Sequence, residues 1–169
     1  MGAPGAAGSL SLSSFRPLQL LALAGFVISL VGTALPWVKA GGESAAPWSG
    51  DFYKGSGSDY LGQLGALIKQ DIPIDAIAVL VIAVVAVYII VAPMMGRPGP
   101  AIPFMGAAVI FGGLMIALGV VEYLHIKKIF DDFGLKDIAK IGTGVYVVIA
   151  GGIVTIVGAF LDQQQQAKL

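Results

Sequence analysis

The chain has 169 residues, of which 57% are apolar and only 12% are charged, and its formal net charge at pH 7 is zero. Soluble domains carry about 25% charged residues, so this composition, with a mean hydropathy of +0.89, predicts one small integral membrane domain without a separate soluble catalytic module. The neutral charge balance argues against nucleic acid as a partner. The absence of cysteine excludes disulfides and thiolate metal sites, and a single histidine argues against a zinc site built from protein ligands alone.

The N-terminal region predicts a tail followed by a first membrane span. Residues 1–16 are expected to be disordered, because their Gly, Ala, Ser and Pro residues leave almost nothing to bury. The apolar run that follows predicts a spanning helix over about 17–38, with Pro17 in its first turn and Pro36 near its end. Trp37 falls at the depth where membrane proteins carry aromatic belts, so we predict it to be an interface anchor.

The longest polar segment, 39–72, predicts a long first loop. Its first part is rich in Gly and Ser and contains Trp48 and Tyr53, which we interpret as interface anchors rather than as a binding surface. Its second part, 59–69, has leucines at helical spacing and predicts a short amphipathic helix on the membrane surface or on the bundle.

Three further spans are predicted over about 73–95, 101–124 and 142–161. A short Gly/Pro turn joins the first two of these as an antiparallel hairpin. The helix that begins near 101 is expected to continue past the membrane boundary to Gly134, and a short amphipathic turn follows before the last span. Residues 162–169 predict a polar tail. The expected fold class is therefore an all-α membrane protein, a four-transmembrane-helix bundle with a long first loop and an amphipathic second large loop.

Small residues recur at helical spacing on three of the four spans. The positions i, i+4 and i+7 of the first span match those of the last when residues 23–35 are aligned without gaps on 149–161, which fits either an internal duplication or the ordinary composition of membrane helices. Small residues at this spacing let helices approach closely in lipid. We predict ten helix-packing positions: Gly25, Ser29, Gly32, Gly106, Gly112, Gly113, Gly119, Gly151, Thr155 and Gly158.

Glu122 and His125 are the one pair that could carry chemistry. They share a helix face at i and i+3, the ligand spacing of carboxylate-bridged di-metal bundles, but the second copy and the further acids that such sites need are missing from the sequence. We interpret the pair as an ion pair or helix-end cap at the bilayer edge. The alternative is a pigment or haem ligand role for His125. We expect no catalytic residue, no metal site and no cofactor.

One short motif and the span layout carry a resemblance. Val31-Gly-Thr-Ala-Leu-Pro-Trp-Val38, a Gly/Ser-rich loop and three more spans resemble the small four-span, tryptophan-associated membrane proteins of bacteria, in which Leu-Pro-Trp closes the first helix and the next loop is external. The layout also resembles claudin-like tetraspans, although the Trp…Gly-Leu-Trp…Cys…Cys signature of their first loop is missing. The resemblance implies no catalytic residues.

The orientation follows from two opposing observations. The side with both termini carries three Lys and Arg residues and the loop side carries seven, which by the positive-inside rule would place the loops in the cytoplasm. However, both arginines lie close to span ends on the terminal side, and the resemblance implies an external first loop. We therefore expect a bacterial cell-membrane protein with cytoplasmic termini and external loops.

The function expected from these features is structural. Spans with abundant glycine faces and little chemistry predict a non-enzymatic membrane protein that assembles with itself or with other membrane subunits. The alternatives are a small oligomeric channel or transporter, whose pore could be lined by Gly, Ser and Thr, and a cofactor-carrying subunit of an electron-transfer or light-harvesting complex.

Overall fold

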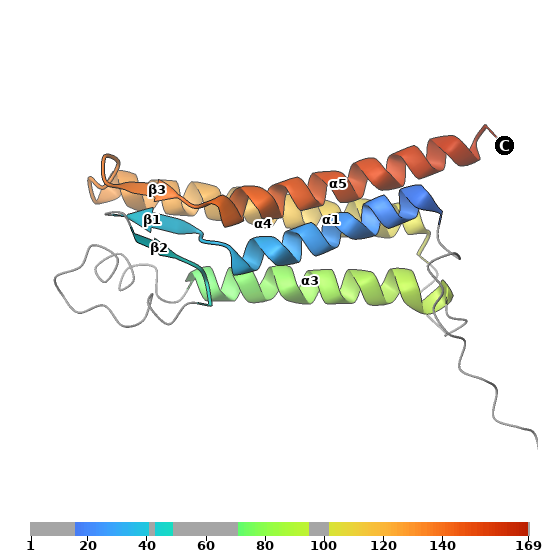
Figure 1. The fold of residues 1–169 in the computed structure, drawn as a ribbon, viewed down its shortest axis with the longest axis horizontal. Helices are drawn as coiled ribbons and strands as arrows, with labels where there is room; N and C mark the ends of the chain where they lie inside the picture. Colours follow the sequence, from blue (N-terminus) through green and yellow to red (C-terminus); the bar gives the residue numbers. More distant parts are fainter. Residues whose placement is uncertain (1–15, 41–42, 49–70, 95–101, 169) are drawn as a thin grey trace, which may run out of the picture.

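The computed structural model describes residues 16–40, 43–48, 71–94 and 102–168, and it is mostly helical (Figure 1). Four helices of these residues are long and apolar enough to cross a membrane. They are α1 (Pro17–Ala34), α3 (Asp71–Met94), α4 (Phe104–Asp132) and α5 (Thr143–Gln166). Four spans were predicted, and the number is confirmed among the described residues.

The four helices lie side by side along the long axis of the molecule (Figure 1). Helix α1 packs most extensively on α5, α5 also packs on α4, and α3 contacts both α4 and α1. Helix α5 therefore lies between α1 and α4, with its two sides covered. The end of α1 and the start of α3 lie at one end of the bundle, while the C-terminus of α5 lies at the other.

A small sheet joins the two large loops at one end of the helices. Strands β1 (Val38–Ala40), β2 (Glu43–Ala45) and β3 (Ala139–Ile141) form an antiparallel sheet in the order β2-β1-β3. Val38 pairs with Ala45 on one side and with Ile141 on the other. The expected all-α class is therefore wrong in this region. A turn does follow Leu135, whose carbonyl oxygen accepts from the Ile138 N–H at 3.1 Å, but residues 139–141 of the amphipathic turn expected there form β3. Strands of three residues depend on a partner about a hundred residues away, which local periodicity cannot reveal.

Trp37 secures the turn between α1 and the sheet. Its side chain is 1% exposed, and its indole Nε1–H donates a hydrogen bond to the Gly32 carbonyl oxygen at 2.9 Å. Its backbone carbonyl accepts from the Gly142 N–H at 2.7 Å. The prediction of Trp37 as an interface anchor is wrong, because its buried indole N–H is hydrogen-bonded inside the protein and is not available to lipid headgroups. Trp48, in contrast, is 47% exposed, as an anchor requires.

Helices α1 and α5 end at other residues than predicted. Helix α1 stops at Ala34, four residues early, with an extended Leu35 as its C-cap. Helix α4 continues to Asp132 as expected, and Gly134, at φ +67°, follows it. Helix α5 runs to Gln166, and Asp162 is buried, so the polar tail does not begin at 162. Predictions for residues 1–15, 59–69, 96–100 and Tyr53 lie outside the described residues.

The buried residues form a core at each end of the bundle, and the outer surface of the helices is apolar. Near the sheet the core contains Trp37, Val38, Ile126 and Phe130. Large apolar side chains remain about half exposed along every helix, among them Val27, Val84, Val121 and Ile153. Continuous exposed apolar surface of this kind is what a lipid environment requires of a spanning helix.

Candidate functional site: the small-residue helix interfaces

The two matching glycine faces pack on each other. In this antiparallel contact, Gly25 of α1 meets Gly151 and Thr155 of α5, and a β-carbon on Gly25 or Gly151 would overlap atoms of the facing helix. Further along, a β-carbon on Gly32 would lie 2.8 Å from the Val148 backbone nitrogen. Real β-carbons are not found this close to a backbone atom, so the separation of α1 and α5 depends on these positions having no side chain.

The two hydroxyl residues of this interface are committed to internal hydrogen bonds. Ser29 Oγ donates across the interface to the Val148 carbonyl oxygen at 3.1 Å. Thr155 Oγ1 donates to the Gly151 carbonyl oxygen of its own helix at 3.0 Å. Both side chains are fully buried. The predicted packing role of Ser29 and Thr155 is therefore seen in the structure, and neither hydroxyl faces an open path.

The glycines of α4 divide into an inward and an outward pair. A β-carbon on Gly112 would lie 2.9 Å from Ile156 Cγ1 and 3.0 Å from the Gly152 carbonyl oxygen. The Ile149 side chain of α5 occupies the space beside Gly119 in the same way. A β-carbon on Gly113 would meet nothing within 4 Å, and one on Gly106 would meet only Ile102 Cγ2 of its own chain segment, at 3.7 Å. Within the described residues, Gly112 and Gly119 thus serve helix packing, whereas Gly106 and Gly113 do not.

Gly152 is a packing residue that the sequence analysis missed. Its own β-carbon would lie 2.7 Å from the Gly112 carbonyl oxygen and 2.8 Å from Ile116 Cγ1. The tandem Gly151-Gly152 was a usable signal, because neighbouring helix positions point about 100° apart. Gly151 faces α1 and Gly152 faces α4, which explains how α5 packs closely on both.

The neighbouring glycines Gly112 and Gly113 provide a matched test. We expect Gly112→Ala to lower the free energy of unfolding by about 1–3 kcal/mol, because the new methyl group must displace α5. We expect Gly113→Ala to raise it by up to about 1 kcal/mol, because alanine is the better helix former and the space is open. Equilibrium unfolding in detergent micelles measures both. Equal effects of the two substitutions would contradict the assignment of faces.

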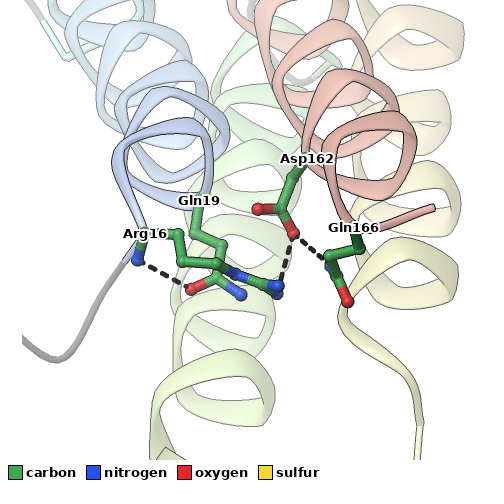
Figure 2. A network of polar contacts seen from close by, with 4 residues as sticks. All are labelled: Arg16, Gln19, Asp162 and Gln166. Atoms are coloured by element: carbon green, nitrogen blue, oxygen red, sulfur yellow. Dashed lines mark hydrogen bonds and ion pairs between the residues drawn. The ribbon is translucent and has the colours of Figure 1, made fainter. Parts of the chain in front are cut away.

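A half-buried ion pair joins the start of α1 to the end of α5 (Figure 2). Arg16 Nη2 lies 2.9 Å from Asp162 Oδ2, which also accepts a hydrogen bond from Gln166 Nε2 at 2.8 Å. The Gln19 side chain accepts from the Arg16 backbone N–H at 3.2 Å. The Asp162 side chain is 1% exposed and that of Arg16 is 46% exposed. The sequence analysis missed this pair, although opposite charges flanking two spans at the same end were a signal for it.

Glu122 and His125 are brought together as the spacing predicted. Glu122 Oε2 lies 3.8 Å from His125 Nδ1, with the Glu122 side chain 1% exposed and that of His125 34% exposed. Glu122 is therefore inside the bundle rather than at its surface. Among residues 16–40, 43–48, 71–94 and 102–168, no cluster of three or more His, Cys, Asp or Glu side chains could hold a metal ion.

The contacts between helices, rather than a catalytic constellation, are thus the best-defined candidate site of this chain. Comparison with known proteins adds no assignment, because no family model matches the sequence and no curated protein or solved structure shows significant similarity to it.

Proposed function

We propose that this chain is a non-enzymatic integral membrane protein with a structural or interaction role, in a bacterial cell membrane with cytoplasmic termini. In this role, the tightly packed helices hold the three-stranded sheet in a fixed position outside the bilayer. The protein assembles with copies of itself or with other subunits of a membrane complex. The observation that carries the proposal is the α1–α5 interface, where backbone meets backbone along most of a span.

The way the two large loops are joined supports this role. Strand β1 follows the first span directly, and β3 immediately precedes the last span. Because β1 pairs with both β2 and β3, the described parts of the two loops share hydrogen bonds next to the ends of α1 and α5. A rigid pair of helices beneath a shared sheet is suited to presenting a surface, and it leaves little freedom for the opening movements that transport needs.

Fewer small-residue positions are open to a partner helix in the membrane than the sequence indicated. Eight of the ten predicted packing positions are filled inside the chain, and the exceptions are Gly106 and Gly113 of α4. These two lie seven residues apart on the outer side of α4, near the exposed side chains of Val109 and Ile110. Glycines at this spacing allow another helix to approach closely, so we propose this side of α4 for assembly.

The mass of the protein extracted with its native lipids tests the proposal. We expect an assembly larger than one chain, and Gly106→Leu/Gly113→Leu should reduce it to a single chain while the Tm of the monomer is preserved. Ala24→Leu, an exposed position on α1, is the matched control and should leave the assembly intact. A single-chain mass for the unaltered protein, together with no partner in cross-linked membranes, would refute the proposal.

The two alternative functions have less support. A pore lined by hydroxyl groups would need Ser29 or Thr155 to face water, but both are buried and bonded to backbone carbonyls. Nδ1 of His125 lies 3.8 Å from Glu122 Oε2, so a pigment or haem on this residue would bind through Nε2. An absorption spectrum of the purified protein tests for such a pigment or haem.

A further inference from the structure

A pocket of about 600 Å³ opens where α4, β3 and α5 meet. Helix α4 contributes Tyr123, Lys127 and Phe130 to its lining, β3 contributes Lys140 and Ile141, and α5 contributes Tyr146. Phe130 is buried at its base, while Lys127 and Lys140 are exposed at its edge. The pocket thus combines an apolar base with cationic groups at its mouth, which matches a ligand that has both an apolar and an anionic part.

The positive charge at this pocket is only partly balanced. Lys136 and Asp131 also line the pocket and neutralise each other, with Lys136 Nζ 3.1 Å from Asp131 Oδ1. No acidic side chain of the described residues lies within ion-pair distance of Lys127 or Lys140. Within the described residues, Lys127 and Lys140 are therefore left to interact with an anion.

The register of the sheet adds a further lysine. Lys39 of β1 lies directly opposite Lys140 of β3 in the antiparallel pair, and both side chains are exposed. Like charges directly opposite each other on neighbouring strands are destabilising. An anion bound beside Lys140 would relieve this repulsion, so the strand pairing and the pocket lining, which share Lys140, both favour a negatively charged ligand.

The depth of the pocket in the membrane indicates which kind of anion fits. Tyr123 lies about 29 Å along α4 from Phe104 at 1.5 Å per residue, close to the roughly 30 Å thickness of the hydrocarbon core. Its ring contacts that of Tyr146 edge to face, with centroids 6.0 Å apart, as expected for aromatic residues at a membrane boundary. Lys127 follows one helical turn further out, at the level of lipid phosphates.

An apolar path leads from the pocket toward the middle of the membrane. Tyr146, Ile153 and Phe160 follow one another at seven-residue spacing on α5, and their exposed fractions are 51%, 49% and 49%. Residues seven apart lie on nearly the same side of a helix. A lipid whose headgroup occupied the pocket could lay an acyl chain along this side of α5.

We propose that the pocket between α4, β3 and α5 binds the phosphate of an anionic phospholipid headgroup, held by Lys127 and Lys140 with Lys39 beside them. The ligand chemistry is a phosphate-bearing anion, and the apolar path along α5 favours a lipid over a free ion. This proposal requires that the helices span a membrane, but it does not depend on the self-assembly proposed above.

The test uses the purified full-length protein in a zwitterionic detergent. Native mass spectrometry measures the retention of phosphatidylglycerol and of phosphatidylcholine with identical chains, and Tm is recorded with each lipid and with sodium phosphate at matched ionic strength. We expect phosphatidylglycerol to bind at least about tenfold more tightly than phosphatidylcholine, since each lysine near anionic lipid contributes about a factor of five. Phosphatidylglycerol should also raise Tm more than phosphatidylcholine does.

Substitutions separate a specific site from general charge attraction. Lys127→Gln/Lys140→Gln should lower the affinity for phosphatidylglycerol about tenfold or more and leave that for phosphatidylcholine unchanged. Lys168→Gln, at the opposite end of the bundle, is the matched control and should change neither. A Tm increase with sodium phosphate as large as that with the lipid would support the anion site but assign it to free phosphate. Equal binding of the two lipids, or an unchanged affinity in the double variant, would overturn the proposal.

Discussion

Gly151→Leu should lower the free energy of unfolding by at least about 3 kcal/mol, which corresponds to a fall in Tm of about 10 °C for a chain of this size. Gly151 faces Ser29 and the Gly25 carbonyl oxygen, and even its first side-chain carbon would overlap both residues. The leucine must therefore push α1 away from α5. The move would also break the hydrogen bond from Ser29 Oγ to the Val148 carbonyl oxygen, leaving a hydroxyl and a carbonyl group without partners in an apolar interior.

Thermal unfolding in detergent micelles measures this effect, and Gly113→Leu is its control. Gly113 is also a glycine within a spanning helix, but a side chain there would meet open space. We expect Gly113→Leu to change the stability of the monomer by less than about 1 kcal/mol, because the leucine would extend into lipid or detergent. A Gly151→Leu protein as stable as the Gly113→Leu protein would show that α1 and α5 do not pack closely through these residues.

Arg16→Ala should lower the free energy of unfolding by about 2 kcal/mol, and with it Tm by about 6 °C. Removing the guanidinium leaves the Asp162 carboxylate buried, with Gln166 as its remaining hydrogen-bond donor among the described residues. Breaking a fully buried ion pair costs about 3–5 kcal/mol, and the lower figure here reflects the partial exposure of Arg16, which lets water screen the pair. The backbone hydrogen bond from Arg16 to Gln19 does not involve the guanidinium and should persist.

A double substitution tests whether the stability lost in Arg16→Ala comes from the Asp162 carboxylate, which is left without its counter-ion. Arg16→Leu/Asp162→Leu removes both charges, and we expect it to recover most of the stability lost in Arg16→Ala, because apolar residues of similar size often replace a buried pair at little cost. Lys168→Ala, which removes an exposed cation just beyond the end of α5, serves as the control. A double variant less stable than Arg16→Ala would mean that the pair contributes net stability rather than only compensating a buried carboxylate.

If the expected effects of Gly151→Leu and Arg16→Ala are observed, helices α1 and α5 are held together at three places along their length. Close backbone contact fixes the middle of the pair, the Arg16–Asp162 ion pair fixes one end, and Trp37 with the sheet fixes the other. A pair secured along its whole length would move as one unit. This property suits the structural role proposed for the protein, since the sheet above the pair would then keep its position relative to the membrane.

The sequence by itself determined the membrane class, the number of spans and most of the packing residues. These features are local: a long apolar run defines a spanning helix, and small residues at helical spacing define a face that another helix can approach. The extension of α4 to Asp132 was predictable for the same reason, because its helical stripe of Ile126, Ile129 and Phe130 continues past the apolar run.

Only the tertiary structure decided which faces meet. It paired Gly25 with Gly151, left Gly113 open beside a filled Gly112, and brought Arg16 to Asp162. It also placed Lys39 opposite Lys140 by joining two distant loops in one sheet. Periodicity shows that a helix has a small-residue face or that a strand alternates, but it carries no information on the partner across the contact. That choice depends on how all four helices fill space together, which is a property of the folded chain as a whole.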